Sequence, residues 1–334
     1  MSNPTKTSSI RPTRPDGSAA SPTATRGPRL SGMNWLIWRQ HRAGFWTLFV
    51  ATAVTVAWLV YQRIDLMDYL TAHGWPDSDK WPEGVHRQRF QLVSYGLGFI
   101  PILLGVFLGA PLLAGDLENG TAKLVASQSV TSSRWLATKL GIGGLVLIVC
   151  TAALSIAFGR WWGPVKNEPT VLGWSDGSAF DNTGPVPVAL ALFTFVGGVV
   201  IGMLLRRTLI SMVVTFAFAV VVQVIWSYFR LDLGHVVTVT TNKGINAFPQ
   251  LPRSALEIDR SLISHSGQTY GWGTCAREVS DKVCVQKFDL VGWSVDYLPI
   301  SQMSGMQWFG ASVLFALTSA VIAFIFIRGR KRIV

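Results

Sequence analysis

Residues 186–228 read VPVALALFTFVGGVVIGMLLRRTLISMVVTFAFAVVVQVIWSY, two long apolar runs separated by Arg206 and Arg207. A helix rises about 1.5 Å per residue, so about 20 apolar residues cross a hydrocarbon core of about 30 Å. Each run meets that length, and the two arginines between them suit a tight turn at a membrane surface. The stretch therefore predicts an all-α polytopic membrane protein.

Four further stretches have the same apolar character. Charged residues make up 14% of the chain and mean hydropathy is +0.37, whereas soluble domains carry about 25% charged residues. This composition excludes a disordered chain and a small disulfide scaffold. As drawn, the spans contain no charged residue or histidine, which argues against a proton relay, an ion-coupled carrier or a voltage sensor. The six predicted transmembrane helices are residues 45–61, 92–114, 140–158, 186–205, 209–228 and 308–327.

Basic residues are distributed unevenly between alternate connections. One set, which includes both termini, holds 16 Lys and Arg against 3 Asp and Glu, and the other set holds 13 against 15. Positive residues mark the cytoplasmic side of a membrane protein. We therefore predict a multi-pass protein of the cell (plasma) membrane with both termini cytoplasmic. The net charge of +11 then reflects topology, and no nucleic-acid partner is expected.

The N-terminal region divides into a tail and a candidate helix. Residues 1–32 are rich in Ser, Thr, Pro and Arg and bury too little apolar surface to offset the entropy of ordering, so we predict a disordered basic tail. Met33 is an alternative translation start. Residues 33–42 mix aromatic, apolar and basic side chains, which suits an interfacial elbow helix before the first span. The alternative is a plain basic flank of that span.

Residues 229–307, between spans 5 and 6, are predicted to form a small extracytoplasmic insert with little helix. The β-branched residues within 235–241 suit a strand. Cys275 and Cys284 lie in this insert, where an oxidising compartment would let them form a disulfide. A zinc site is the alternative, although two thiols supply only half of a structural site. The insert is equally compatible with a structural cap and with a substrate gate.

Small and polar residues inside the spans indicate helix packing. Gly105 and Gly109 in the second span, and Gly198 and Gly202 in the fourth, have the spacing that lets helix backbones approach closely. We expect this packing within one chain, with a dimer face as the alternative. Gln223 in the fifth span requires a helix partner or a wet pathway. Cys150, in the third span, is expected to be a small packing residue.

The connection between spans two and three carries the most specific pattern. Residues 109–140 read GAPLLAGDLENGTAKLVASQSVTSSRWLATKL. Two carboxylates follow the end of span two, a Gly-Thr pair suits the end of one helix and the cap of the next, and two basic residues precede the return to the membrane. A short helix between two anchored ends would pass the motion of a cytoplasmic partner to both spans.

This pattern resembles the first cytoplasmic loop of ABC-2 type transporter permeases. In that family the loop begins with the pattern acidic-x-Glu-x-Gly-Thr. A short helix follows, then a Ser-Arg pair and a Lys that enters the next span. Six spans, cytoplasmic termini and an elbow helix are also similar, so the resemblance covers residues 33–334 as one transmembrane domain that includes the insert at 229–307. The insert is larger than the usual family connection, so the family's outer gate is not carried over. The matching loop residues are Asp116, Glu118, Gly120, Thr121, Ser133, Arg134 and Lys139.

The resemblance implies the membrane-spanning permease subunit of an ATP-binding-cassette transporter. It implies that a separate ABC ATP-binding subunit docks on this loop and holds ATP and Mg, and that a second permease copy or homologue completes a dimer in membrane lipid. The transported compound is expected to be hydrophobic or amphiphilic and to be exported.

No catalytic, cofactor-binding or metal-ligating residue is expected in this chain, which makes it a transport subunit and not an enzyme. Gly115 and Gly120 have the spacing of a phosphate-binding loop, but the lysine is missing, and no His-Glu-x-x-His is present. The alternative function is a non-transporting membrane sensor, assembly or immunity protein that binds a ligand through its outer insert.

Overall fold

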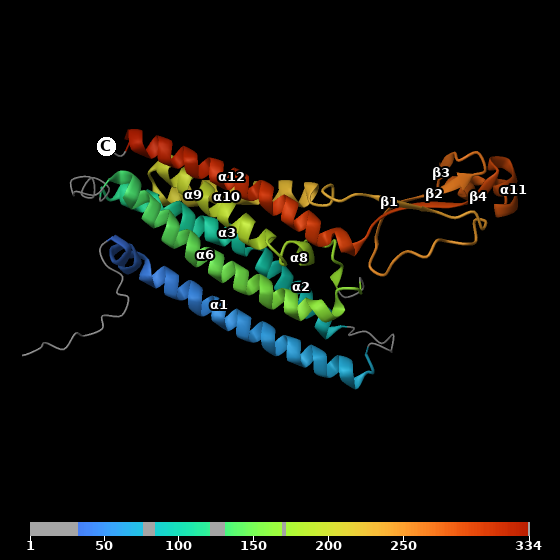
Figure 1. The fold of residues 1–334 in the computed structure, drawn as a ribbon, viewed down its shortest axis with the longest axis horizontal. Helices are drawn as coiled ribbons and strands as arrows, with labels where there is room; N and C mark the ends of the chain where they lie inside the picture. Colours follow the sequence, from blue (N-terminus) through green and yellow to red (C-terminus); the bar gives the residue numbers. More distant parts are fainter. Residues whose placement is uncertain (1–32, 76–83, 121–130, 169–171, 333–334) are drawn as a thin grey trace, which may run out of the picture.

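The computed structural model describes residues 33–75, 84–120, 131–168 and 172–332, and it shows a bundle of long helices with a small β-sheet at one end (Figure 1). Six of the described helical segments are long and apolar enough to cross a membrane, which confirms the predicted polytopic helical fold. The tail predicted at residues 1–32 lies outside the described residues. The helical elements of the bundle are α1 (Met33–Ala72), α2 (Val85–Gly98), α3 (Ile100–Leu104), η1 (Gly105–Gly109), α4 (Ala110–Glu118), α6 (Ser132–Trp162), η2 (Gly163–Val165), α8 (Gly177–Phe180), α9 (Val186–Leu205), α10 (Thr208–Phe229), η4 (Ile300–Gln302) and α12 (Met303–Arg332).

Helix α1 is much longer than the span predicted within it. It has 40 residues, which corresponds to about 60 Å or twice the hydrocarbon core of a bilayer. The residues at 33–42 are the first turns of this one helix, so an elbow helix separate from the first span is not confirmed. In Figure 1 these turns, drawn in dark blue, bend away from the axis of the rest of the helix.

The second span is a broken helix. Helix α2 ends at Gly98, and after Phe99 helix α3 begins with Pro101 in its first turn, where the missing N–H of proline costs no helical hydrogen bond. The turn at Gly105–Gly109 is a π-helix, after which α4 continues to Glu118. Such wide turns are uncommon and frequently occur at functional positions. The predicted span at 92–114 is therefore one path through four short helical elements.

Helix α9 is the centre of the bundle, and it contacts α3, η1, α4, α6, α10 and α12. Its glycines permit this close packing. A Cβ atom on Gly202 would overlap the backbone of Ala110, and one on Gly198 would overlap the carbonyl oxygen of Gly105. A Cβ atom on Gly109 would in turn overlap the backbone of Phe195. The two glycine pairs therefore pack spans two and four together within one chain, as expected from their spacing.

The insert is a four-stranded antiparallel sheet with strand order β1-β4-β2-β3. The predicted strand within 235–241 is β1, whose Val239 pairs with Val295 of β4, and β4 pairs along its length with β2. Figure 1 shows that this sheet projects beyond the helices. The elements of the insert are β1 (Val237–Thr240), β2 (Leu256–Ser264), β3 (Thr269–Gly271), η3 (Thr274–Arg277), α11 (Asp281–Phe288) and β4 (Leu290–Leu298).

The two ends of the bundle have different contents. The start of α1, the start of α6 and the end of α12 lie together at the end opposite the sheet (Figure 1). We call this the loop end, because α4 ends there and α6 begins there. The sheet end holds an aromatic core in which the rings of Phe90 and Trp161 stack with centroids 3.9 Å apart. The described termini lie on one side of the bundle, as six crossings require.

Candidate functional site

At the loop end, Asp116 and Lys139 form an ion pair inside the protein. Asp116 lies two residues before the end of α4, and Lys139 lies in the third turn of α6, so the pair joins the two helices that flank the loop. The exposed fraction of the Lys139 side chain is 0% and that of Asp116 is 9%. Removing two charges from water is costly, so such a pair needs additional hydrogen bonds to be favourable.

Those additional bonds come from a third helix and from the backbone. Gln40 of α1 donates from Nε2 to Asp116 Oδ1 at 3.0 Å, and Lys139 Nζ donates to the carbonyl oxygen of Leu112 at 3.1 Å. The ammonium group also lies 4.9 Å from the ring centroid of Trp135. We call Gln40, Asp116 and Lys139 the loop-base cluster. It ties α1, α4 and α6 together at the base of the loop.

Glu118 makes a second connection, from the end of α4 to the start of α10. Its Oε2 accepts hydrogen bonds from the backbone N of Thr208 at 2.8 Å and from Thr208 Oγ1 at 2.7 Å. A carboxylate at this position satisfies one free N–H group in the first turn of α10 and interacts favourably with the positive end of the helix dipole. Although Glu118 is exposed to solvent, its two bonds to Thr208 hold the first residue of α10, directly after the turn at Arg206 and Arg207.

The other predicted loop residues that the structure describes lie just after α4 or in the first turn of α6. Gly120 ends the described segment with a φ of 69°, a backbone conformation that suits glycine after a helix. Ser133 and Arg134 begin α6, and Arg134 is exposed and forms no ion pair with the described residues. Thr121 and the rest of residues 121–130 lie outside the described residues. The structure thus brings Asp116 and Lys139 into contact and leaves Arg134 at the surface.

Sequence reasoning missed Gln40 and His41. Gln40 lies 76 positions before the carboxylate that it contacts, and nothing in the pattern of residues 33–42 distinguishes it from a surface residue. Asp116 and Lys139 do carry a signal in the sequence. Charged residues close to the ends of spans require polar partners when they are buried. His41 lies beside this cluster, and its Nε2 is buried without a hydrogen bond to the described residues.

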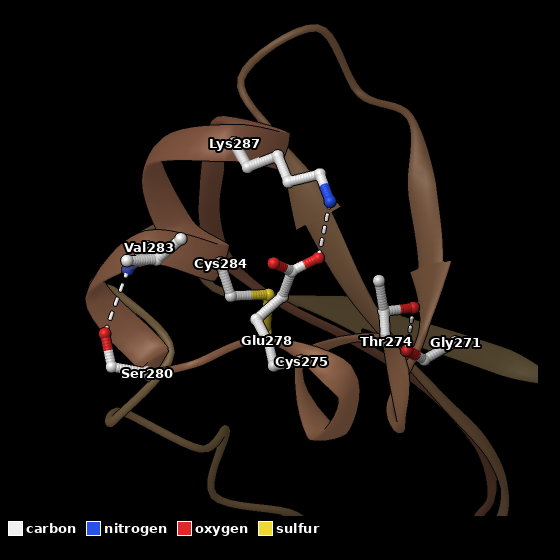
Figure 2. Close-up of a disulfide and its surroundings, with 8 residues drawn as sticks. All are labelled: Gly271, Thr274, Cys275, Glu278, Ser280, Val283, Cys284 and Lys287. Carbon is white, nitrogen blue, oxygen red and sulfur yellow. Dashed lines mark hydrogen bonds and ion pairs between the residues drawn. A yellow bond between two sulfur atoms is a disulfide. The ribbon is translucent and has the colours of Figure 1, made fainter.

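The predicted disulfide is present in the sheet domain. Cys275 of η3 and Cys284 of α11 are bonded, with their Cα atoms 5.4 Å apart (Figure 2). The closed loop is short, and a cross-link of this size stabilises a fold by about 2 to 3 kcal/mol in the chain-entropy model. Ser280 caps α11 through the backbone N of Val283, and Lys287 pairs with Glu278 at 2.6 Å beside the disulfide. Cys150 is buried among apolar residues, as expected for a packing residue.

Comparison with known proteins gives one informative match. Residues 49–230 match the family model described as ABC-2 membrane transporter related. The match includes the whole second span, the loop and the turn at Arg206, and it ends where the chain leaves α10 for the sheet. Neither the curated proteins nor the solved structures give a match to this chain. Because the matched residues make up more than half of the protein, the chain belongs to the ABC-2 membrane transporter related family.

Proposed function

We propose that this protein is the permease subunit of an ATP-binding-cassette transporter and that the connection between α4 and α6 receives the motion of a separate ATP-binding subunit. The observation that supports this proposal best is the convergence of four spans on the flanks of that loop. The loop-base cluster holds α1, α4 and α6 together, and Glu118 holds α4 to α10. A force applied between residues 119 and 131 would therefore reach four helices.

Topology supports a cytoplasmic position for the loop. The loop end carries the predicted excess of Lys and Arg, including the basic residues at 328–332, and such residues remain on the cytoplasmic side. The sheet then lies outside the cell. Its disulfide agrees with this orientation, because disulfides persist in oxidising compartments and are rare in the cytosol.

In the proposed mechanism the chain has no chemical step of its own. The partner subunit binds ATP and Mg, and its differential contacts with the loop shift the permease between inward-open and outward-open states. A second copy or a homologue completes the transport path with cyclic symmetry. The cargo is a hydrophobic or amphiphilic compound, and the direction is export.

The proposal is tested by co-expression with the ATPase encoded beside this gene, followed by purification through a tag on this chain and measurement of ATP hydrolysis in lipid. The most informative variant is Arg134→Glu, because Arg134 is exposed and its replacement breaks none of the described ion pairs. We expect the ATPase activity of the complex to fall by about tenfold, equivalent to about 1.4 kcal/mol of lost interaction.

Two further variants separate docking from folding. Glu118→Gln retains an oxygen that accepts from Thr208, so it tests the charge at this position, whereas Glu118→Lys also breaks the connection to α10. Arg87→Glu is the matched control, since Arg87 is an exposed arginine in the first turn of α2 at the sheet end. Equal activity in Arg134→Glu and Arg87→Glu would remove the loop from the proposal. A chain that purifies without any ATPase would favour the sensor, assembly or immunity function.

A further inference from the structure

A pocket of about 680 Å³ lies at the sheet end, on the side of the bundle. Its walls come from α2 and α3, from the segment 172–182 that contains α8, and from α9 and α10. Its volume falls within the usual range of about 300–1,000 Å³ for small-molecule sites. Exposed side chains line the pocket on both of these sides, Tyr95 and Phe99 at the end of α2 and Val224 on α10, so it is open at the surface of the bundle between these two helices.

One wall of the pocket is built around the ion pair of Asp181 and Arg230. Arg230 donates from one guanidinium nitrogen to Asp181 Oδ2 at 2.8 Å, and Trp226 Nε1 donates to Asp181 Oδ1 at 2.6 Å. Burial raises the pKa of the Asp181 carboxyl above its ordinary value, while Arg230 and Trp226 oppose that rise. The Nε atom of Arg230 is buried and has no hydrogen-bond partner among the described residues. The wall therefore carries an unused donor.

Two amides on other elements supply unused acceptors. Gln223 of α10 donates from its amide nitrogen to the carbonyl oxygen of Gly98 at 2.7 Å. Asn182 likewise donates to the carbonyl oxygens of Ser94 and Ser178 at 2.8 and 2.7 Å. Both side chains line the pocket, and within the described part of the chain neither amide oxygen accepts a hydrogen bond. Gln223 thus bonds to the end of α2 and also lines a cavity. These are the helix partner and the pathway that were expected as alternatives for a polar side chain in a span.

Much of the remaining lining is apolar, together with the polar residues Gln91, Ser94, Ser175, Asp176, Ser178 and Ser227. Leu97, Ile102, Leu190, Val220 and Val224 line the pocket from α2, α3, α9 and α10. An occupant that satisfies both kinds of wall has an apolar body and a polar head. A purely polar solute would leave these side chains in contact with water, and a pure hydrocarbon would leave Arg230 Nε unpaired.

The charges of the wall define the head group. Arg230 is already balanced by Asp181, so an anionic head would compete with an existing 2.8 Å ion pair. The carboxylate of Asp176 also lines the pocket, but this residue is exposed, so water screens its charge, and its Oδ2 accepts from the backbone N of Gly173 at 3.2 Å. The groups without a described partner include Nε of Arg230 and the two amide oxygens, which suit a neutral head with hydroxyl or amide groups. We propose that this pocket binds a neutral amphiphile that enters from the side between α2 and α10. Naming this occupant as the cargo rests on the proposed transport function, whereas the binding itself does not.

The test uses the full chain in lipid nanodiscs without the ATPase, so that its failure is separate from failure of the coupling experiment. Three photoactivatable probes share one octyl chain with a diazirine and differ in the head group, which is β-glucoside, sulfate or trimethylammonium. We expect saturable labelling of peptides that contain Leu97, Ile102 or Val220 by the glucoside, and competition by unlabelled octyl glucoside. Preference for the sulfate or the trimethylammonium probe would overturn the neutral head group.

Two variants of α10 form a matched pair. Val224 and Val221 are each 55% exposed, but Val224 lines the pocket and Val221 does not. Val224→Trp fills the pocket and should lower saturable labelling by about tenfold, whereas Val221→Trp should leave it within about twofold. Gln223→Leu should raise the half-saturating glucoside concentration by about tenfold through the loss of one hydrogen bond. Unsaturable labelling, or an equal effect of both tryptophan variants, would show that the probe samples lipid-facing surface and would overturn the site.

Discussion

The two ends of the helix bundle each contain an ion pair, and the two pairs are used differently. At the loop end, Lys139 and Asp116 have side-chain exposures of 0% and 9%, and Gln40, a backbone carbonyl and an indole ring complete their surroundings. At the sheet end, Arg230 and Asp181 have exposures of 13% and 21%, and a nitrogen of Arg230 has no partner among the described residues.

The difference separates a structural charge pair from one that borders a binding surface. The donors and acceptors of the loop-base cluster are bonded to one another, so the cluster fixes the relative positions of the helices that supply it, while Nε2 of His41 beside it has no hydrogen-bond partner among the described residues. A pair that leaves a buried donor beside a cavity pays a desolvation cost that an occupant can recover. The comparison therefore predicts that changes at the loop end affect stability and coupling, and that changes at the sheet end affect binding.

The largest expected effect comes from breaking the loop-base cluster. Lys139→Met leaves the Asp116 carboxylate buried without its main partner, which costs about 3 to 5 kcal/mol. We expect the variant to give little folded protein and a much lower midpoint of thermal unfolding in nanodiscs, measured by tryptophan fluorescence.

A paired variant tests whether the charge or the packing is responsible. In Lys139→Met with Asp116→Leu both charges are absent, and most of the lost stability should return because apolar replacements of a buried pair are often neutral or favourable. ATPase stimulation should stay low in the double variant if the cluster transmits motion. If the double variant is as unstable as Lys139→Met, then lost packing, and not an unpaired buried charge, causes the instability.

An intermediate effect is expected at Asp181. Asp181→Asn replaces one of the two oxygens that accept from Arg230 and Trp226 by an NH2 group, which cannot accept, and this should cost about 1 to 2 kcal/mol. The pH dependence has a definite sign. Because the pKa of Asp181 is raised in the folded protein, the folded state binds its proton more tightly than the unfolded state does. This group therefore adds stability as pH falls from the raised pKa toward the ordinary aspartate value.

The measurement is the free energy of unfolding of the wild-type protein and of Asp181→Asn at several pH values. The stability of the wild type relative to the variant should increase as the solution is acidified through that window. A relative decrease over the same window would mean that Arg230 dominates burial and that the pKa is lowered.

The smallest effect is expected for Arg89 and Asp65, which join α2 to α1 at the surface. Their atoms lie 2.7 Å apart, but the side chains are 38% and 40% exposed. An exposed pair contributes about 0 to 1 kcal/mol to stability. The free energy of unfolding of Arg89→Leu should therefore differ from that of the wild type by no more than about 1 kcal/mol. If Arg89→Leu lost as much stability as Lys139→Met, the burial of an ion pair would not determine how much that pair contributes.

Hydropathy predicted the spans most accurately where a helix lies entirely in the apolar core. The fourth span was expected at residues 186–205 and α9 is Val186–Leu205, and the fifth, expected at 209–228, is Thr208–Phe229. It failed where helices extend beyond that core. Hydropathy reports burial in lipid and not helicity, so the charged turns of α1 after residue 61 were assigned to a connection.

The candidate sites were predicted unevenly for a related reason. Residues close in sequence, such as Asp116 and Glu118 or Cys275 and Cys284, form patterns that can be read in one chain. The contacts of Gln40 with Asp116 and of Asp181 with Arg230 join residues 76 and 49 positions apart, and they depend on how helices pack. The sheet shows the same limit, since β1 was expected but its pairing with β4 required the fold.

The sheet domain is attached to the bundle at two roots, one after α10 and one before α12, and it can act as a lever. At these roots the backbone N and O of His235 are bonded to the side chain of Gln302 at 2.7 and 2.8 Å. Strands β2 and β4 each have nine residues, which corresponds to a length of about 30 Å. A rotation of about 5° between α10 and α12 would then move the far tip of the sheet by about 2.6 Å over that length. A small rotation of the helices would thus become a larger displacement at the tip of the sheet. The 97% exposed Val279 is a position at which such movements can be observed.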